Sequence, residues 1–244
     1  TDAYDKESMG ASTERHNARY DLTRDAQDQV AALSHQHAAA AQAAGVFDDE
    51  IVPVAVPQRR GEPVLVTADE GIRPDTTVES LAGLRAAFAD GGSITAGNSS
   101  QISDGASAVV VTTRGTAEAK GWPVLVTVGA SGQTAGPDNS LQAQPARAIE
   151  RACEKQGIAP ADLDVVEINE AFGAVVARSQ VELGLSSDVV NIHGGGIAIG
   201  HPIGASGTRL VVHVAHELAR RGSGTAAVGL CGGGGQGEAL ILTR

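Results

Sequence analysis

The second half of the chain alternates short apolar runs with amphipathic stretches. Apolar runs that predict β-strands cover 124–128, 163–168, 189–192, 225–231 and 238–243. Helical patterns lie between them at 145–156, 169–183 and 206–221, each followed by a glycine. This β-α-β-α-β rhythm predicts an α/β fold, and the last two strands are close enough in sequence to form a hairpin with its tight end at Cys231.

The beginning of the chain is polar and then strongly helical. Residues 1–22 are expected to be irregular, whereas a helix is expected from Thr23, which can cap it, to Gly45, which can end it. His35 and His37 lie two positions apart in this helix and therefore point to different sides. We expect both histidines on the solvated surface.

Between this helix and the second half, the elements are small and mixed. Apolar runs at 51–56 and 64–66 predict short strands, and the proline in the first makes it an edge strand. The Thr76-x-x-Glu79 pattern predicts a capping box that opens a helix through Phe88. The β-branched run Val109–Val111 is typical of a strand that is buried on both faces.

Composition and charge exclude several classes of function. The net charge of −11 argues against non-specific binding to nucleic acid and to anionic membrane surfaces. No apolar run has the length of a membrane span, and the ligand spacings of metal sites are absent. Two cysteines, Cys153 and Cys231, without a secretory signal, favour a reducing, cytoplasmic setting. Cys153 falls on the apolar stripe of its helix and is expected to be a buried hydrophobe.

Three polar side chains lie at chain reversals in the last third. Asn169 follows a strand, His201 lies in a glycine-rich loop and is stiffened by Pro202, and Cys231 ends a strand before a run of glycines. Each has a simpler interpretation as a helix cap, a loop residue and a buried thiol. Loops at one edge of an α/β sheet converge on a ligand site, however, and a cysteine beside a histidine favours a thiolate. The glycines after Cys231 leave backbone N–H groups open to an oxyanion.

These segments carry a family resemblance. Asn169–Phe172, Gly200–Gly207 and Cys231–Gly237 resemble the three C-terminal signatures of thiolases, the acetyl-CoA acyltransferases. Further thiolase-like segments are Ser8-Met9-Gly10, Gly97-Asn-Ser-Ser100 and Asp104-Gly105-Ala106. The resemblance implies a thiolase-like fold, layered α-β-α-β-α. It divides the chain into a loop domain (1–92), the end of an N-terminal domain (93–121) and a C-terminal domain (122–244).

The resemblance also implies roles for single residues. His201 would be the base that activates an acyl-accepting cysteine and would donate a hydrogen bond to the thioester oxygen. Asn169 would hold a water at that oxyanion site, Cys231 would be the acid/base thiol, and the N–H of Gly233 would help form a second oxyanion hole. Residues implied in coenzyme A binding are Ser100, Ala171, Phe172, Met9 and Phe88 along the pantetheine, and Arg73 and Ser80 at the nucleotide, where Arg59 and Arg60 could add positive charge. Coenzyme A thioesters would be substrates, with no cofactor and no metal.

Two departures from the thiolase pattern shape the expected function. Ser8 stands where short-chain biosynthetic thiolases often have histidine, which leaves the acyl-chain preference open. The Asn-x-x-Cys-x-Ser-type motif of the nucleophilic cysteine is absent, and Cys153 has no such surroundings. We therefore expect the C-terminal portion of a thiolase that lacks the N-terminal half. This chain alone should be inactive, and it should be poorly soluble because Val109–Val111 would lack neighbouring strands. The whole protein is expected to be a homodimer or homotetramer. The alternative is a coenzyme A-binding or assembly module without turnover.

Overall fold

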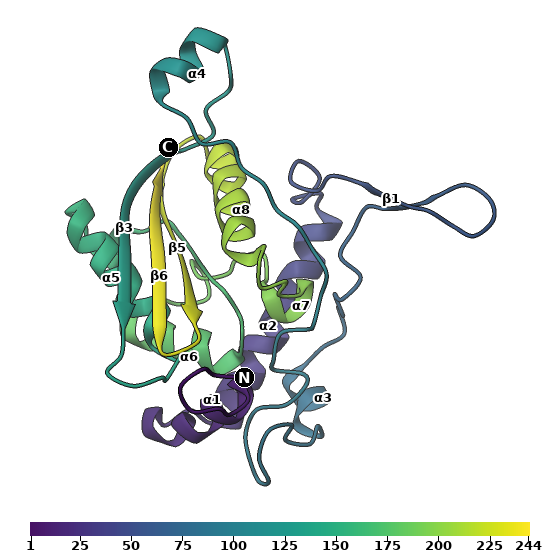
Figure 1. Ribbon diagram of the computed structural model, residues 1–244, viewed down its shortest axis with the longest axis vertical. Coiled ribbons are helices and arrows are strands. Elements are labelled where there is room, and N and C mark those ends of the chain that lie inside the picture. Colours follow the sequence, from purple (N-terminus) through teal and green to yellow (C-terminus); the bar gives the residue numbers. More distant parts are fainter.

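A four-stranded mixed sheet forms the centre of the molecule, in a computed structural model that describes residues 1–244 (Figure 1). The strand order is β3-β6-β5-β4, and only β4 and β5 are parallel. The strands are β3 (Thr127–Ala135), β4 (Val165–Ile168), β5 (Thr225–Gly232) and β6 (Gln236–Thr243). The predicted α/β fold and the terminal hairpin are confirmed, with Cys231 paired to Gly237. The predicted strand at 189–192 is reduced to one bridge between Val190 and Val166.

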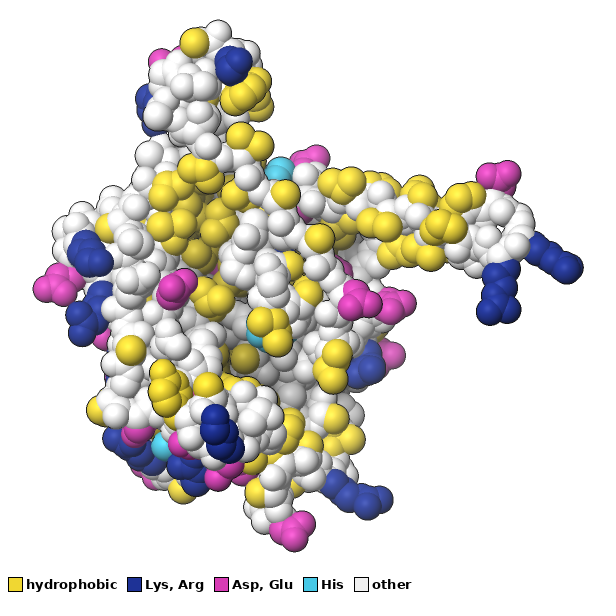
Figure 2. Space-filling view, viewed as in Figure 1, with side chains coloured by type: hydrophobic (Ala, Val, Ile, Leu, Met, Phe, Trp, Pro, Cys, Tyr) yellow, Lys and Arg dark blue, Asp and Glu magenta, His cyan; other side chains and the backbone are white.

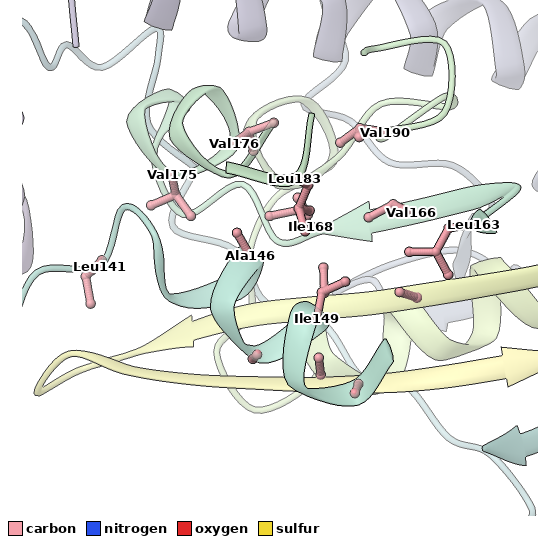
Figure 3. Packing of buried hydrophobic residues seen from close by; sticks show 14 of the residues in the cluster. Leu141, Ala146, Ile149, Leu163, Val166, Ile168, Val175, Val176, Leu183 and Val190 are labelled. Atoms are coloured by element: carbon pink, nitrogen blue, oxygen red, sulfur yellow. The ribbon is translucent and has the colours of Figure 1, made fainter. Parts of the chain in front are cut away.

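Helices cover both faces of this sheet. On one face pack α5 (Gln144–Gln156) and α6 (Gly173–Leu183), and on the other packs α8 (Ser206–Arg221). Alternation along β5 assigns the faces, because Ala226 and Val228 join the cluster around α8 while Ala227 joins the cluster around α5. Figure 3 shows side chains of α5, α6 and β4 converging in the larger cluster. The expected burial of Cys153 in α5 is confirmed, since it is 1% exposed.

The first residues contain a helix that the polar sequence did not predict. α1 (Met9–Asn17) begins at Ser8, whose Oγ accepts the N–H of Ala11, and a short 3-10 turn, η1 (Ala18–Tyr20), follows. The Glu14 carboxylate accepts the backbone N–H groups of Ser93 and Ile94. A polar helix is therefore held by hydrogen bonds to the rest of the chain rather than by an apolar face.

The long helix α2 (Arg24–Ala43) begins and ends as predicted. The Thr23 Oγ accepts the N–H of Ala26, and Gly45 takes a φ of +71° just beyond the helix. The expectation of a solvated His35 was wrong. This ring is 3% exposed, and its Nδ1 accepts the backbone N–H of Arg73. His37 is also only partly exposed, and its Nδ1 lies 3.2 Å from the carbonyl oxygen of Asn191.

Small elements follow α2, as expected, but one is shorter than predicted. β1 (Val54–Val56) and β2 (Val64–Val66) form a hairpin that projects from the body and exposes all six side chains (Figures 1 and 2). α3 spans only Val78–Ala82, because its capping box joins Thr77 to Ser80 and its C-cap is Gly83. The predicted capping box of Thr76 and Glu79 and the predicted extension of this helix through Phe88 were both wrong.

The prediction of a buried strand at Val109–Val111 was wrong. It is extended but unpaired, and no backbone group of residues 104–112 makes a hydrogen bond within the chain. Val110 is 83% exposed. A strand needs a neighbour for its N–H and C=O groups, and none is present here. The remaining elements are α4 (Arg114–Lys120), η2 (Pro160–Asp162) and α7 (Gly196–Ile199). None of the helices is long and apolar enough to cross a membrane.

Candidate functional site

The site lies at the carboxyl ends of the two parallel strands. Ile168, the last residue of β4, is in register with Gly229 of β5, and the N–H of Asn169 donates to the Gly229 carbonyl at 2.9 Å. Cys231 lies two residues further along β5. Parallel strands end at one edge of a sheet, so the predicted residues Asn169 and Cys231 share that edge.

His201 reaches the same edge from the loop between α7 and α8. Its Nε2 lies 3.2 Å from the Asn169 Nδ2, and its Nδ1 lies 2.6 Å from the Ser206 Oγ. The Ser206 hydroxyl donates to the Pro202 carbonyl at 3.0 Å, so it accepts from His201. Nδ1 therefore carries the ring proton, and Nε2, which accepts from the Asn169 amide, keeps its lone pair.

The electrostatic surroundings keep this imidazole neutral. Burial lowers the pKa of His201, and the Arg209 guanidinium lowers it further. A neutral ring with an unprotonated Nε2 can take a proton from a thiol or a hydroxyl group. The ring is only partly exposed, which limits competition from water.

Cys231 is a thiol rather than a thiolate. Burial of its sulfur raises the pKa to about 12. The hydrogen bonds of the neighbouring histidine go to Asn169 and Ser206, and none to Cys231. The sequence pattern favoured a thiolate at this position, but desolvation outweighs any stabilisation of the charge. The resting residue can therefore give a proton but cannot readily take one.

The loop after Cys231 is tied down by the beginning of the chain. The Asp2 carboxylate, 1% exposed, accepts the N–H of Gly234 at 2.8 Å and also those of Tyr4 and Asp5. Gly234 has a φ of +79°, which few residues other than glycine adopt. Gly233 is exposed at the turn before it. A tethered loop holds the backbone N–H groups in fixed directions, as an oxyanion hole requires.

Five of the seven residues predicted to bind coenzyme A form one region. The N–H of Ser100 donates to the Ala171 carbonyl at 3.1 Å, and the rings of Phe172 and Phe88 meet edge to face at 6.0 Å. Met9 packs on the core cluster that contains Phe172. The Phe88 ring occupies the space in which a Cβ on Gly10 would lie, 2.3 Å away, so a larger residue there would displace the ring.

The side chains predicted to bind the nucleotide end of coenzyme A make no contact with this region. Arg73 and Ser80 are exposed around α3, where the Ser80 hydroxyl is part of the helix cap. Arg59 and Arg60 lie in the exposed turn of the β1–β2 hairpin, which points away from the body. Their proposed contacts with a nucleotide stay predictions.

Sequence reasoning missed two side chains that shape the site. Ser206 fixes the His201 ring, and its place five residues after the histidine, at the start of a helix, could have indicated this. Glu170 was visible within the Asn-Glu-Ala-Phe signature but was given no role. It is 1% exposed beside Asn169. Cys153, by contrast, lies in the core, where burial raises the pKa of its thiol.

Comparisons with known proteins agree along the whole chain. Residues 1–115 match the family described as "Thiolase, N-terminal domain" and residues 122–244 match "Thiolase, C-terminal domain". The chain is 56% identical over 243 residues to a "Probable acetyl-CoA acetyltransferase" of Mycolicibacterium smegmatis. That alignment covers 100% of this chain and 63% of the relative. An "Acetyl-CoA acetyltransferase" of Pseudomonas aeruginosa is 47% identical over 244 residues, which are 62% of its length.

Solved structures show the same fold. The Bacillus anthracis acetyl-CoA acetyltransferase is 40% identical with a TM-score of 0.95, over 99% of this chain and 61% of that one. Human mitochondrial 3-ketoacyl-CoA thiolase in complex with CoA is 35% identical with a TM-score of 0.93, over 100% of this chain and 60% of that one. The chain thus spans less than two thirds of the length of these relatives. With both domain families matched and the site residues at one sheet edge, this chain belongs to the thiolase family.

Proposed function

We propose that the chain supplies the acid/base and coenzyme A-binding part of a thiolase-type acyltransferase. The reaction is thiolytic cleavage of a 3-ketoacyl-CoA, or the reverse condensation of acetyl-CoA with an acyl-CoA. The observation that carries the proposal is the neutral His201, held between Asn169 and Ser206 at the strand edge that also bears Cys231. The relatives named as acetyl-CoA acetyltransferases support it. Coenzyme A thioesters are the substrates, and no further cofactor is needed.

His201 performs the first proton transfer in this proposal. Its Nε2 lone pair takes the proton of an acyl-accepting thiol, and the thiolate attacks the 3-keto carbon. The resulting Nε2–H can donate to the developing oxyanion, while the Ser206 Oγ keeps the ring oriented through Nδ1. Asn169 lies against the same nitrogen and can place its amide, directly or through a water, toward that oxygen.

Cys231 performs the second proton transfer. When the bond between C2 and C3 of the substrate breaks, the electron pair stays on C2 as the enolate of acetyl-CoA. The Cys231 thiol, protonated at rest, gives its proton to C2 and releases acetyl-CoA. The N–H of Gly233, in the loop tethered by Asp2, stabilises the enolate oxygen. The Cys231 thiolate then takes the thiol proton of free coenzyme A, whose sulfur attacks the acyl carbon. The first thiol leaves as a thiolate and recovers its proton from His201, which restores both residues.

The acyl-accepting thiol itself comes from a complementary thiolase segment in this proposal. The chain has two cysteines. Cys153 is buried in the core, and Cys231 is needed as the acid. The relatives are longer than the matched region by more than a third of their own length, which leaves room for such a segment.

An apolar groove on the surface supports docking of this segment there. It has a volume of about 640 Å³ and lies between α8, the approach to β3 and residues 108–114, of which 108–112 are unpaired. Its walls include Val109–Val111, Trp122, Leu125 and Val211. Figure 2 shows the apolar side chains gathered on this face below α4. An apolar groove beside nine residues with free backbone groups fits a partner that adds a β-strand.

Co-expression tests this proposal. The chain is produced with a thiolase segment that bears the Asn-x-x-Cys motif, and co-purification and thiolysis of acetoacetyl-CoA are measured. Val110→Lys should abolish co-purification and activity, because it places a charge beside the added strand. Val181→Lys is the matched control, since Val181 is also exposed, at 69%, but lies on α6 outside the groove. Coenzyme A binding by the complex without thiolysis would instead support the binding or assembly module.

The proposal also covers the location, the assembly and the metabolic role of the whole protein. We expect a cytoplasmic homodimer or homotetramer that acts in fatty acid metabolism, including β-oxidation. Light scattering of the co-purified complex tests the assembly, and a complex that contains one copy of each segment would contradict it.

A further inference from the structure

Glu170 is a buried carboxylate at the centre of the site, and it takes no part in the proposed proton transfers. It is 1% exposed and follows Asn169 directly in the sequence. Its Oε2 accepts the Ser34 hydroxyl at 2.5 Å and the N–H of Ile197 at 3.0 Å. Its Oε1 accepts the Asn191 Nδ2 at 2.8 Å. Three donors from three parts of the chain therefore converge on one carboxylate.

The hydrogen-bond partners of Glu170 lie next to the segments that carry Asn169 and His201. Ile197 belongs to α7, which ends one residue before Gly200 and so leads into His201. Asn191 accepts the N–H of Ile168 through Oδ1 and donates to the Ile168 carbonyl through Nδ2, which fixes the end of β4 before Asn169. The carboxylate thus joins the segment that carries the histidine to the strand end that carries the amide.

The surrounding backbone is shaped to let the carboxylate approach. A Cβ on Gly195 would lie 2.5 Å from the Glu170 Cδ, and a Cβ on Gly194, whose φ is +79°, would lie 2.3 Å from the Ser34 carbonyl oxygen. The Ser34 Oγ also accepts the N–H groups of Gly195 and Ala198 at 3.2 and 3.3 Å. The glycines before α7 therefore serve this contact in addition to the bend of the loop.

The hydrogen bonds to Glu170 favour its ionised form. Burial raises the pKa of Glu170, and the donors from Ser34, Ile197 and Asn191 oppose that shift. Both oxygens accept hydrogen bonds from the chain, which stabilises the negative charge. An amide in place of the carboxyl group would turn one acceptor into a donor against Asn191 or against Ile197 and Ser34.

We propose that Glu170 is a positioning residue which, as a three-way hydrogen-bond acceptor, sets the distance between Asn169 and His201. The kinetic part of this inference rests on the thiolase function proposed above. The structural part does not, because it concerns the two side chains alone.

The test compares Glu170→Gln with Glu167→Gln. Glu167 is an equally buried carboxylate of β4, but its hydrogen bond goes to Arg209 and none goes to residues 191–206. In ¹⁵N-labelled chain, Glu170→Gln should shift the signals of the Asn169 side-chain amide and the His201 ring nitrogens, and Glu167→Gln should leave the amide signal in place. In the complex with the complementary segment, Glu170→Gln should lower kcat on the order of 10²-fold, with KM within about 3-fold, because a displaced catalytic group costs turnover rather than binding.

The outcomes separate the inference from its alternatives. A side chain that only fills space tolerates an amide of equal size, so unchanged signals and a kcat within about 3-fold of the original protein would overturn the proposal. Should Glu170→Gln not fold, Ser34→Ala removes one donor and keeps the carboxylate. It should shift the same two signals less, and unshifted signals would again overturn the proposal. Absence of turnover in the unsubstituted complex would refute the function but leave the NMR result decisive for Glu170.

Discussion

The Nδ2 of Asn169 lies 3.2 Å from the Nε2 of His201, and the other ring nitrogen is held by the Ser206 hydroxyl at 2.6 Å. This contact joins a strand end to a loop 32 residues further along the chain. It fixes the tautomer of the ring and leaves the lone pair on the nitrogen that faces the amide.

Asn169→Asp should raise the pKa of His201. A carboxylate beside the imidazole stabilises its protonated form and opposes the effect of burial, which lowers that pKa. An NMR titration of the His201 ring measures the shift. Asn139→Asp is the matched control, because the Asn139 Oδ1 lies 3.1 Å from the Nε2 of another histidine, His16. The account is contradicted if the control moves the His201 titration as much as Asn169→Asp does.

The folded chain should lose stability as the pH falls from about 6.5 to about 4. Burial and the neighbouring His213 lower the pKa of His193 to about 4, against the opposing charges of Glu217 and Glu50. Between these pH values the unfolded chain binds a proton that the folded chain does not, so the free energy of unfolding decreases toward acid. His35 and His201, whose pKa values are also lowered, act in the same direction.

Urea unfolding of His193→Asn checks this contribution. Between pH 7 and pH 4.5, the variant should lose about 2.4 kcal/mol less stability than the original chain, because this interval covers about 1.8 pH units of the lowered His193 pKa at 1.36 kcal/mol each. An unaltered pH dependence in the variant would show that folding does not lower the pKa of His193.

Cys231 should react slowly with iodoacetamide. With a pKa of about 12, its thiolate population at pH 8 is on the order of 10³-fold below that of an unperturbed thiol. Alkylation of Cys231, followed by mass spectrometry in a Cys153→Ala background, should therefore be slow in the folded chain and fast in urea. Equal rates under both conditions would mean that the thiol is not desolvated.

Asp2→Asn should loosen the loop that carries Gly233. The amide group would present a donor to the N–H of Gly234 or to those of Tyr4 and Asp5. We expect at least about tenfold less protection of the Gly234 N–H in hydrogen exchange at pH 7. Asp5→Asn is the control, since the Asp5 carboxylate pairs with Arg15 instead. Equal protection of Gly234 in all three proteins would contradict the tether.

The sequence predicted the second half of the fold well because its signals are local. Pro145, the apolar stripe through Ile149 and Cys153, and the αL glycine at 157 define α5 without reference to the rest of the chain. The positions of Asn169, His201 and Cys231 at chain reversals are equally local. Their convergence could be expected because parallel strands end at one edge.

The errors arose where distant contacts decide the structure. α1 is stabilised by Glu14 reaching Ser93 and Ile94, about eighty residues away, which a polar pattern cannot reveal. His35 is buried because it caps the N–H of Arg73. The β-branched run Val109–Val111 predicts a strand, yet a strand forms only when a neighbouring strand pairs with it. Glu170 was overlooked because its partners come from three separate segments.

Intact-mass analysis after incubation with acetyl-CoA tests the central claim most directly. The chain alone should gain no acetyl group. With the complementary segment, one acetyl group should appear on the Asn-x-x-Cys cysteine of that segment and vanish with His201→Asn. Acetylation of Cys231 or Cys153, or turnover by this chain alone, would contradict the account.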